Sequence, residues 1–278
     1  MEATVVTPYD ISGRLWLRVG RYRGFVLSAR PFVIGRLGAT TVRAHPSLLL
    51  AGVVLVMLFA PRFDAGGANP YLVGVVFVVA LYASVLVHEL AHMAVALAYG
   101  LRVPSVTLHL LGGETRIAGG SRGPLQEALT SVVGPLASAS VGLVASVGVG
   151  AVQDPTAAQV LWSLGWINLL IAGFNLLPAP PLDGGHVVAA IVWGISGRPS
   201  SGTRASGWSG RATAVLAVVV VVWFSLGSSR GLVDVLVAVI VAGFLWTSAG
   251  QALRLATLQR RHEDADDEPH PGSGRTTP

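Results

Sequence analysis

The residues best suited to do chemistry in this chain are His88, Glu89 and His92, which form a His-Glu-x-x-His sequence. On a helix, residues four positions apart project from one face, so the two imidazoles can hold one metal ion together. Glu89 lies one step around the helix and can reach a water molecule bound to that metal. These residue types at this spacing indicate metal-assisted hydrolysis, with Glu89 as the general base.

The apolar sequence around this motif limits the kinds of hydrolysis that it can perform. It lies inside an apolar stretch from Val75 to Tyr99 that is long enough to cross a membrane. An ionised glutamate in hydrocarbon is costly unless a large positive charge compensates it. A zinc ion supplies that charge, and we therefore expect one Zn2+ per chain, bound within a membrane-spanning helix.

The composition is that of a multi-pass membrane protein. Of the 278 residues, 52% are hydrophobic and only 12% are charged, which is about half the charged fraction of soluble domains. The mean hydropathy is +0.64. There is no cysteine, which excludes disulfides and thiolate metal sites, so histidine, aspartate or glutamate must hold any metal.

Six apolar segments predict a helical protein with about six spans, most of them near the roughly 20 residues that a membrane requires. The second begins at Asn69 and Pro70, a good N-cap followed by proline at the first helical position. The six run approximately over residues 46–60, 69–100, 128–152, 158–177, 212–226 and 232–249.

The arginines predict the orientation of these spans. All 19 basic residues are arginine, and with a cytosolic amino terminus all but Arg62 and Arg230 fall on the cytosolic side. The positive-inside rule then puts both termini in the cytosol of a cell-membrane protein. The excess of basic residues therefore reflects the orientation of the spans, and we expect no nucleic-acid partner. We also expect no cleavable signal peptide, because the first 44 residues are too charged.

Three regions follow from this pattern. Residues 1–45 form a cytosolic arm, in which 32–36 and 40–42 are expected to be two short strands around a turn. Residues 46–252 form the membrane domain. Residues 253–278 form a cytosolic tail that we expect to be disordered, because from Arg260 onward it is rich in acidic residues, proline and glycine.

A third metal ligand is needed, because catalytic zinc sites usually have three protein ligands and one water. Asp183 is the candidate, in the run Asn175-Leu-Leu-Pro-Ala-Pro-Pro-Leu-Asp183-Gly-Gly. Its prolines must break the helix at the cytosolic end of the fourth span. Glu89 lies 11 residues before Gly100, which ends the second span at the cytosolic face. This separation is about 16 Å along a helix axis, and Asp183 follows the fourth span at the same face.

The His88–His92 motif in a span, followed by this proline-rich run, resembles the site-2 protease family of intramembrane zinc metalloproteases, in a bacterial form without PDZ or CBS domains. The resemblance implies a three-helix core over about residues 70–190. It also implies cleavage of a membrane-spanning segment in a single-span protein, such as a membrane-tethered anti-sigma factor. The cut would lie near the cytosolic face and follow an earlier cut. Asn175, or less well Asn168, would stabilise the oxyanion, and the strand-like segment around Gly112 and Gly113 would hold unwound substrate.

We expect structural rather than catalytic roles for the other histidines and for a series of small residues. We expect His45 to anchor the first span at the interface, and His109 and His186 to lie at the surface or beside a ligand. Small residues at every fourth position of the third span predict close helix packing; they are Gly134, Ser138, Gly142, Ser146 and Gly150. The resembled family usually has asparagine where this chain has Ser138.

Two alternatives to a protease remain open at this point. A metal- or proton-coupled transporter would also place histidine and aspartate in the membrane, but it should show internal repeats or paired broken helices. A catalytically inactive relative would bind membrane-spanning segments without cutting them. The complete set of two histidines, a glutamate and an aspartate argues against the second alternative.

Overall fold

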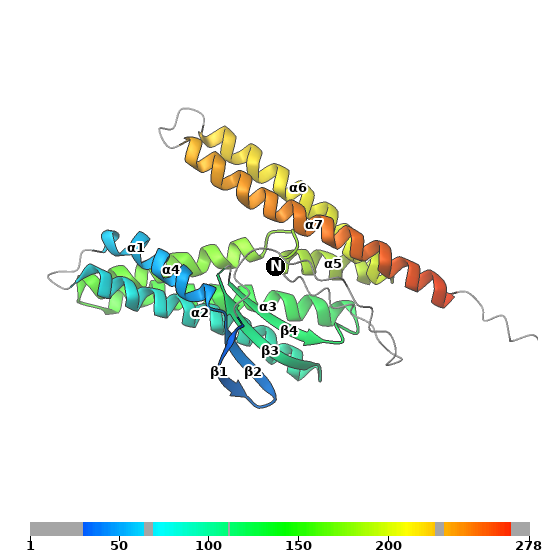
Figure 1. Ribbon diagram of the computed structural model, residues 1–278, viewed down its shortest axis with the longest axis horizontal. Coiled ribbons are helices and arrows are strands. Elements are labelled where there is room, and N and C mark those ends of the chain that lie inside the picture. The colour runs from blue at the N-terminus through cyan, green and yellow to red at the C-terminus, as the bar shows by residue number, and fades with distance from the viewer. Residues whose placement is uncertain (1–29, 64–68, 111, 226–230, 268–278) are drawn as a thin grey trace, which may run out of the picture. The chain divides into compact units, whose positions relative to one another are not determined.

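The computed structural model describes residues 30–63, 69–110, 112–225 and 231–267. This part of the chain is mostly helical, with one small four-stranded sheet (Figure 1). It divides into two compact units. The first comprises Met1–Arg122 and Leu129–Phe174, and the second comprises Gly123–Ala128 and Asn175–Pro278. The predicted fold class, a helical polytopic protein with small strand elements, is confirmed.

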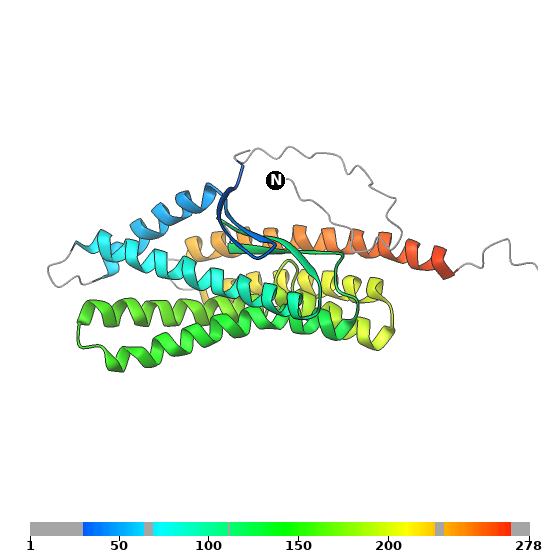
Figure 2. The ribbon, with the colours of Figure 1, turned by 90° about the horizontal axis from the view of Figure 1, so that it is seen from below.

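The first unit is built around three long helices that lie side by side (Figure 2). They are α2 (Pro70–Ala98), α3 (Pro124–Gly148) and α4 (Pro155–Asn175), and a shorter α1 (Ser47–Phe59) precedes them. The predicted start of α2 is confirmed, because the Asn69 side chain accepts a hydrogen bond of 2.9 Å from the Tyr71 N–H. Phe77 of α2 is completely buried in an apolar cluster to which Val160 and Ile167 of α4 contribute.

Small residues bring α3 and α4 into backbone contact, as the four-residue ladder predicts. A Cβ atom on Gly142 would lie 2.9 Å from the Gly165 carbonyl oxygen, and one on Gly165 would lie 2.5 Å from Ser146 Oγ. Neither position can carry a side chain without a shift of the helices. The Ser146 hydroxyl donates to the Gly142 carbonyl at 2.8 Å, which satisfies this polar group inside its own helix.

Strands are present at the two predicted positions in the arm and in the strand-like segment around Gly112 and Gly113, and they join into one sheet. The strands β1 (Phe32–Leu37), β2 (Thr40–Ala44), β3 (Arg102–His109) and β4 (Gly112–Ala118) lie in the order β1-β2-β3-β4. The outer pairs are antiparallel, whereas β2 and β3 are parallel. Parallel pairing needs a long crossover, and here α1 and α2 supply it.

The second unit consists of three helices, α5 (Asp183–Ser196), α6 (Pro199–Ser225) and α7 (Gly231–Asp267). The segment 179–211, which lies between the fourth and fifth predicted spans, is largely helical, because it contains α5 and the first half of α6. Its glycines and serines permit close helix contacts rather than turns. A Cβ atom on Gly202 would lie 2.2 Å from the Ala189 carbonyl oxygen, and one on Gly210 would lie 3.1 Å from Ala249 Cβ.

The prediction of a disordered tail is wrong as far as Asp267, because α7 continues to that residue. Glu263 explains the difference, since its carboxylate accepts hydrogen bonds from the Ser200 N–H at 2.9 Å and the Ser200 hydroxyl at 2.5 Å. These bonds satisfy donors that the start of α6 would otherwise leave without partners. The remainder of the predicted tail, residues 268–278, lies outside the described residues, as does most of the predicted arm.

Five helices of the described chain are long and apolar enough to cross a membrane, namely α2, α3, α4, α6 and α7. The first predicted span is a shorter apolar helix. Large apolar side chains are exposed along several of these helices; for example, Val147 is 79% exposed and Trp223 is 72% exposed. Such surfaces suit contact with lipid. The chain is an integral multi-pass membrane protein.

Candidate metal centre

His88 and His92 project from one face of α2 into the protein interior, as their spacing predicts. Their side chains are buried, and the two Nε2 atoms lie 3.1 Å apart. Two nitrogens bound to one tetrahedral zinc ion, each at about 2.0–2.1 Å, would be separated by about 3.3 Å. The two imidazoles are therefore already close to the separation that a shared metal ion requires.

Hydrogen bonds to α3 orient both rings. His92 Nδ1 lies 2.6 Å from the Thr130 carbonyl oxygen, which can only accept, so Nδ1 carries the proton and Nε2 keeps its lone pair. His88 Nδ1 lies 2.9 Å from the hydroxyl oxygen of Ser138, which is completely buried. Partners of this kind fix the orientation of metal-binding histidines, so Ser138 takes a supporting position beside His88.

Gly134 keeps open the space in front of both Nε2 atoms. A Cβ atom at this position would lie 2.2 Å from His92 Nε2 and 2.6 Å from His88 Nε2. Any residue other than glycine would therefore occupy the place where a metal ion must sit. This space faces two Nε2 atoms, and the Nδ1 atoms of the same rings are held by hydrogen bonds to α3. It therefore suits a zinc ion.

Glu89 is buried beside the two histidines and is held by β4. The Thr115 hydroxyl lies 2.7 Å from Glu89 Oε2 and 3.0 Å from the Glu89 carbonyl oxygen, and it can donate to either acceptor. A Cβ atom on Gly113 would lie 2.3 Å from Glu89 Cγ, so glycine is needed there for the strand to lie against the glutamate. Gly112, in contrast, has a positive φ of 128° and open space around its Cα.

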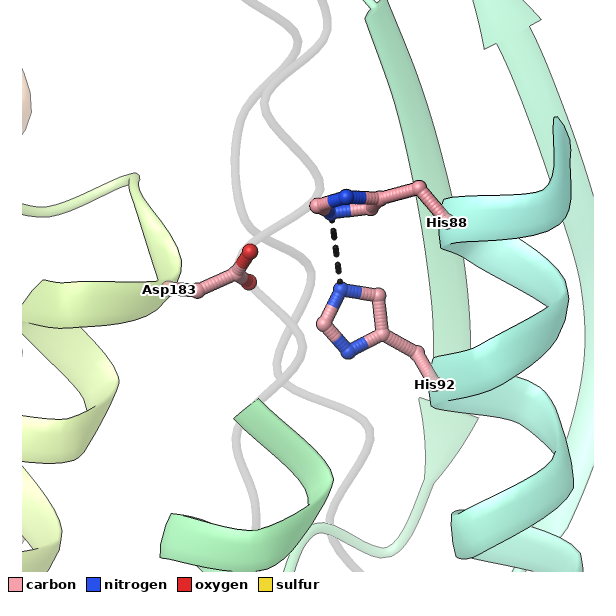
Figure 3. A group of neighbouring side chains, drawn as sticks. All are labelled: His88, His92 and Asp183. Atoms are coloured by element: carbon pink, nitrogen blue, oxygen red, sulfur yellow. Dashed lines mark hydrogen bonds between the residues drawn. The ribbon is translucent and has the colours of Figure 1, made fainter. Parts of the chain in front are cut away.

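Asp183 is the first residue of α5 and follows the proline-rich run. Gly184 and Gly185 allow the chain to turn tightly, because a Cβ atom on either would lie within 2.5 Å of the backbone of Leu176 or Pro180. Asp183, His88 and His92 each offer one ligand atom, and these atoms lie within 4.8 Å of one another (Figure 3). Two imidazole nitrogens and one carboxylate oxygen form a donor set that suits zinc with one open position.

The two asparagines considered for the oxyanion differ in their surroundings. Asn168 is completely buried in α4, and its Nδ2 donates to the Leu164 carbonyl oxygen at 2.9 Å. Asn175 is the last residue of α4 and is partly exposed. Its role in stabilising an oxyanion stays a prediction.

Three other histidines of the described chain, His45, His109 and His186, lie outside the group of candidate metal ligands. His45 Nδ1 accepts hydrogen bonds from the Ser47 N–H and hydroxyl, at 3.2 and 2.8 Å, and thereby supports the start of α1. The exposed His186 lies 2.9 Å from Glu127 Oε1. Burial lowers the pKa of His109 at the end of β3, an effect that the charge of Glu114 opposes and that of His45 reinforces.

Two supporting residues were not predicted from the sequence. Thr130 acts through its backbone carbonyl, so the type of its side chain does not indicate the role. Thr115 lies in the strand-like segment after the glycine pair, and only the folding of β4 against α2 brings it to Glu89. Gly134 was singled out as the first member of the small-residue ladder, but the ladder predicted close helix packing and not a space beside the histidines.

Known proteins resemble this chain over most of its length. Peptidase family M50 matches residues 76–155 and 146–220. The chain is 33% identical over 203 residues to sll0528 of Synechocystis sp., covering 71% of this chain and 52% of that protein. It is 33% identical over 240 residues to Rip3 of Mycobacterium tuberculosis, covering 81% of this chain and 60% of that protein. Both relatives carry zinc metalloprotease in their names, and this chain spans only about half to three-fifths of their lengths.

The solved structure of the site-2 protease from Methanocaldococcus jannaschii has a similar fold. Its TM-score with this chain is 0.55 at 24% identity, and the match covers 81% of this chain and 95% of that one. At this level of identity the likeness concerns the fold.

Proposed function

Because this chain belongs to peptidase family M50, we propose that it is an intramembrane zinc endopeptidase that cleaves a membrane-spanning segment of another protein. One observation carries the proposal. His88 and His92 direct two Nε2 atoms 3.1 Å apart toward the space that Gly134 leaves open, with Glu89 buried alongside. The transporter alternative has no comparable support in the site geometry or in the family match.

Each residue of the site has a distinct task in peptide hydrolysis. His88, His92 and Asp183 would hold a zinc ion, which when bound would activate a water molecule and polarise the scissile carbonyl. Glu89 accepts the proton of the attacking water on a carboxylate oxygen and delivers it to the leaving amine nitrogen. Thr115 orients that carboxylate, while Thr130 and Ser138 orient the imidazoles.

The position of β4 indicates how a substrate is held. In the described sheet β4 has one neighbouring strand, β3, so its other edge offers unpaired backbone groups. Gly113 and Thr115 of this strand contact Glu89. A substrate segment must unwind before cleavage, because helical hydrogen bonds occupy its carbonyls. An unwound segment that pairs with the free edge of β4 would pass close to the general base.

The finer features of the reaction rest on the sequence. The proposed substrate is a single-span membrane protein, such as an anti-sigma factor, embedded in the same lipid bilayer and already cut once by another protease. The distribution of arginines supports cytosolic termini in a bacterial cell membrane and a cut near the cytosolic face. Asn175 is the proposed donor to the oxyanion, since it ends α4 just before the run that leads to Asp183.

A comparison of three purified proteins tests the proposal. The wild-type chain, Glu89→Gln and Glu114→Gln are incubated with a panel of single-span membrane proteins, and bound zinc is measured for each. Glu114 is a matched control because it lies on β4 with an exposed side chain. We expect zinc in all three proteins, and cleavage by the wild type and Glu114→Gln only. Cleavage by Glu89→Gln at the wild-type rate would contradict the general-base assignment, and absence of zinc from the wild type would contradict the metal site.

A further inference from the structure

The second unit contains an arginine that is held between two indole rings. The Cζ atom of Arg211 on α6 lies 5.0 Å from the ring centroid of Trp208 and 5.0 Å from that of Trp246 on α7. Its Nε atom is buried and has no hydrogen-bond partner among the described residues. No described acidic side chain forms an ion pair with this arginine. The two indoles thus hold the guanidinium group, whose positive charge has no acidic partner among the described residues.

The level of Arg211 along the membrane follows from the sequence of the two helices. On α6 no charged residue occurs from Ala212 to Ser225, and on α7 none occurs from Val235 to Gly250. Arg211 and Trp246 therefore lie where apolar segments meet polar ones. Tryptophan is enriched at the membrane–water interface. A guanidinium at this boundary would lie at the level of the lipid headgroups.

A groove of about 500 Å³ extends from the arginine along the apolar half of α6. Its lining includes Val215, Leu216 and Val219, each more than half exposed. One end of the groove is thus cationic, and the rest is apolar and follows the charge-free half of α6. A second groove of similar volume, between α3 and α4, includes Val144 and Leu164 and has no charged residue in its lining.

We propose that the groove beside Arg211 binds one anionic phospholipid. The planar guanidinium donates hydrogen bonds to the lipid phosphate, the indoles of Trp208 and Trp246 lie against the glycerol region, and an acyl chain follows the apolar lining. Charge complementarity favours a phospholipid over a protein segment, because an apolar membrane-spanning helix would leave the positive charge of Arg211 without a counter-charge. The negative charge of cytosolic-leaflet lipids adds to the attraction.

Native mass spectrometry of the purified full-length protein in mild detergent tests this proposal. Phosphatidylglycerol and phosphatidylcholine with the same acyl chains are added in equal amounts. We expect the wild type to retain one phosphatidylglycerol in preference to phosphatidylcholine. Arg211→Gln should bind phosphatidylglycerol about tenfold more weakly and lose the preference. Arg204→Gln, which removes an exposed arginine of the same helix, should bind like the wild type.

Two further variants keep the test decisive if Arg211→Gln does not fold. Arg211→Lys keeps the charge without the planar fork and should bind with intermediate affinity. Leu216→Trp fills the apolar part of the groove, keeps the arginine, and should also weaken phosphatidylglycerol binding about tenfold. Equal affinity of the wild type for both lipids, or unchanged phosphatidylglycerol binding by the Arg211 and Leu216 variants, would overturn the proposal. A dimer that Leu216→Trp abolishes without loss of lipid would assign the groove to a second copy instead.

Discussion

Substitution of Gly134 by alanine is the sharpest test of the metal centre, because it adds one methyl group where the metal should lie. The new Cβ atom would stand 2.2 Å from His92 Nε2 and 2.6 Å from His88 Nε2, whereas ordinary contacts begin at 3.4 Å. Each imidazole must therefore retreat by about 1 Å, or α3 must move away from α2. Movement of α3 would break the hydrogen bonds from the histidines to Thr130 and Ser138.

Either response weakens zinc binding strongly. Zinc–ligand distances in proteins are kept within about 0.2 Å, so a displacement of about 1 Å exceeds the tolerance several times. Loss of an outer hydrogen-bond partner alone costs about 10–100-fold in affinity. We expect Gly134→Ala to bind zinc at least about 100-fold more weakly than the wild type, which corresponds to about 3 kcal/mol.

The measurement is competition for zinc with a chelator of known affinity, together with the zinc content of the monodisperse protein. Gly142→Ala is the matched control, since it makes the same change on the same helix, two turns further along. Its Cβ atom would meet the Gly165 carbonyl oxygen at 2.9 Å, so we expect lower stability but normal zinc affinity. If Gly134→Ala binds zinc as tightly as the wild type, the histidines do not share a metal ion in this space.

Three further substitutions test the supporting contacts. Ser138→Ala removes the partner of His88 Nδ1 and should lower zinc affinity about tenfold; unchanged affinity in the chelator assay would show that the contact does not orient the ring. Thr115→Val should leave the zinc content unchanged but slow cleavage about tenfold, because the Glu89 carboxylate loses its hydroxyl donor; a normal rate would remove Thr115 from the mechanism. Glu263→Ala should reduce stability by about 1 kcal/mol, because the Ser200 donors at the start of α6 lose their acceptor; an unchanged melting temperature would contradict this.

The candidate metal ligands could be predicted from the sequence because their geometry is local. Helical spacing alone places His88 and His92 on one face of α2, and the cap at Asn69 defines where that helix begins. Asp183 could be predicted for a different reason: in a chain without cysteine the acids near the spans are few, and the prolines before it must break a helix.

The supporting groups could not be predicted because they depend on contacts between distant segments. The contribution of Thr130 is a backbone carbonyl, which every residue type has. Thr115 reaches Glu89 only because β4 is anchored to β3, which in turn pairs in parallel with β2 across α1 and α2. No local pattern in the sequence specifies that parallel pairing.

The predicted fifth span, 212–226, misses the first half of α6, because glycine and serine have different effects in water and in a helix bundle. In a soluble chain the segment around Gly202 and Gly207 would favour turns. Between packed helices the same residues allow backbones to approach, and a Cβ atom on Gly207 would lie 2.7 Å from Leu253 Cγ. The hydropathy of the segment is low because its interior face is built from small residues rather than large apolar ones.

The same reasoning explains why Ser138 can stand where the resembled family usually has asparagine. The His88 imidazole needs one hydrogen-bond partner on its Nδ1 atom, and the serine hydroxyl meets that need at 2.9 Å. Ser138 is completely buried, one helical turn beyond Gly134, whose missing side chain leaves room for the metal. A longer asparagine side chain would need more space between α2 and α3 at this level. The close approach of α3 to α2 at Gly134 is therefore what lets the short serine side chain reach the ring.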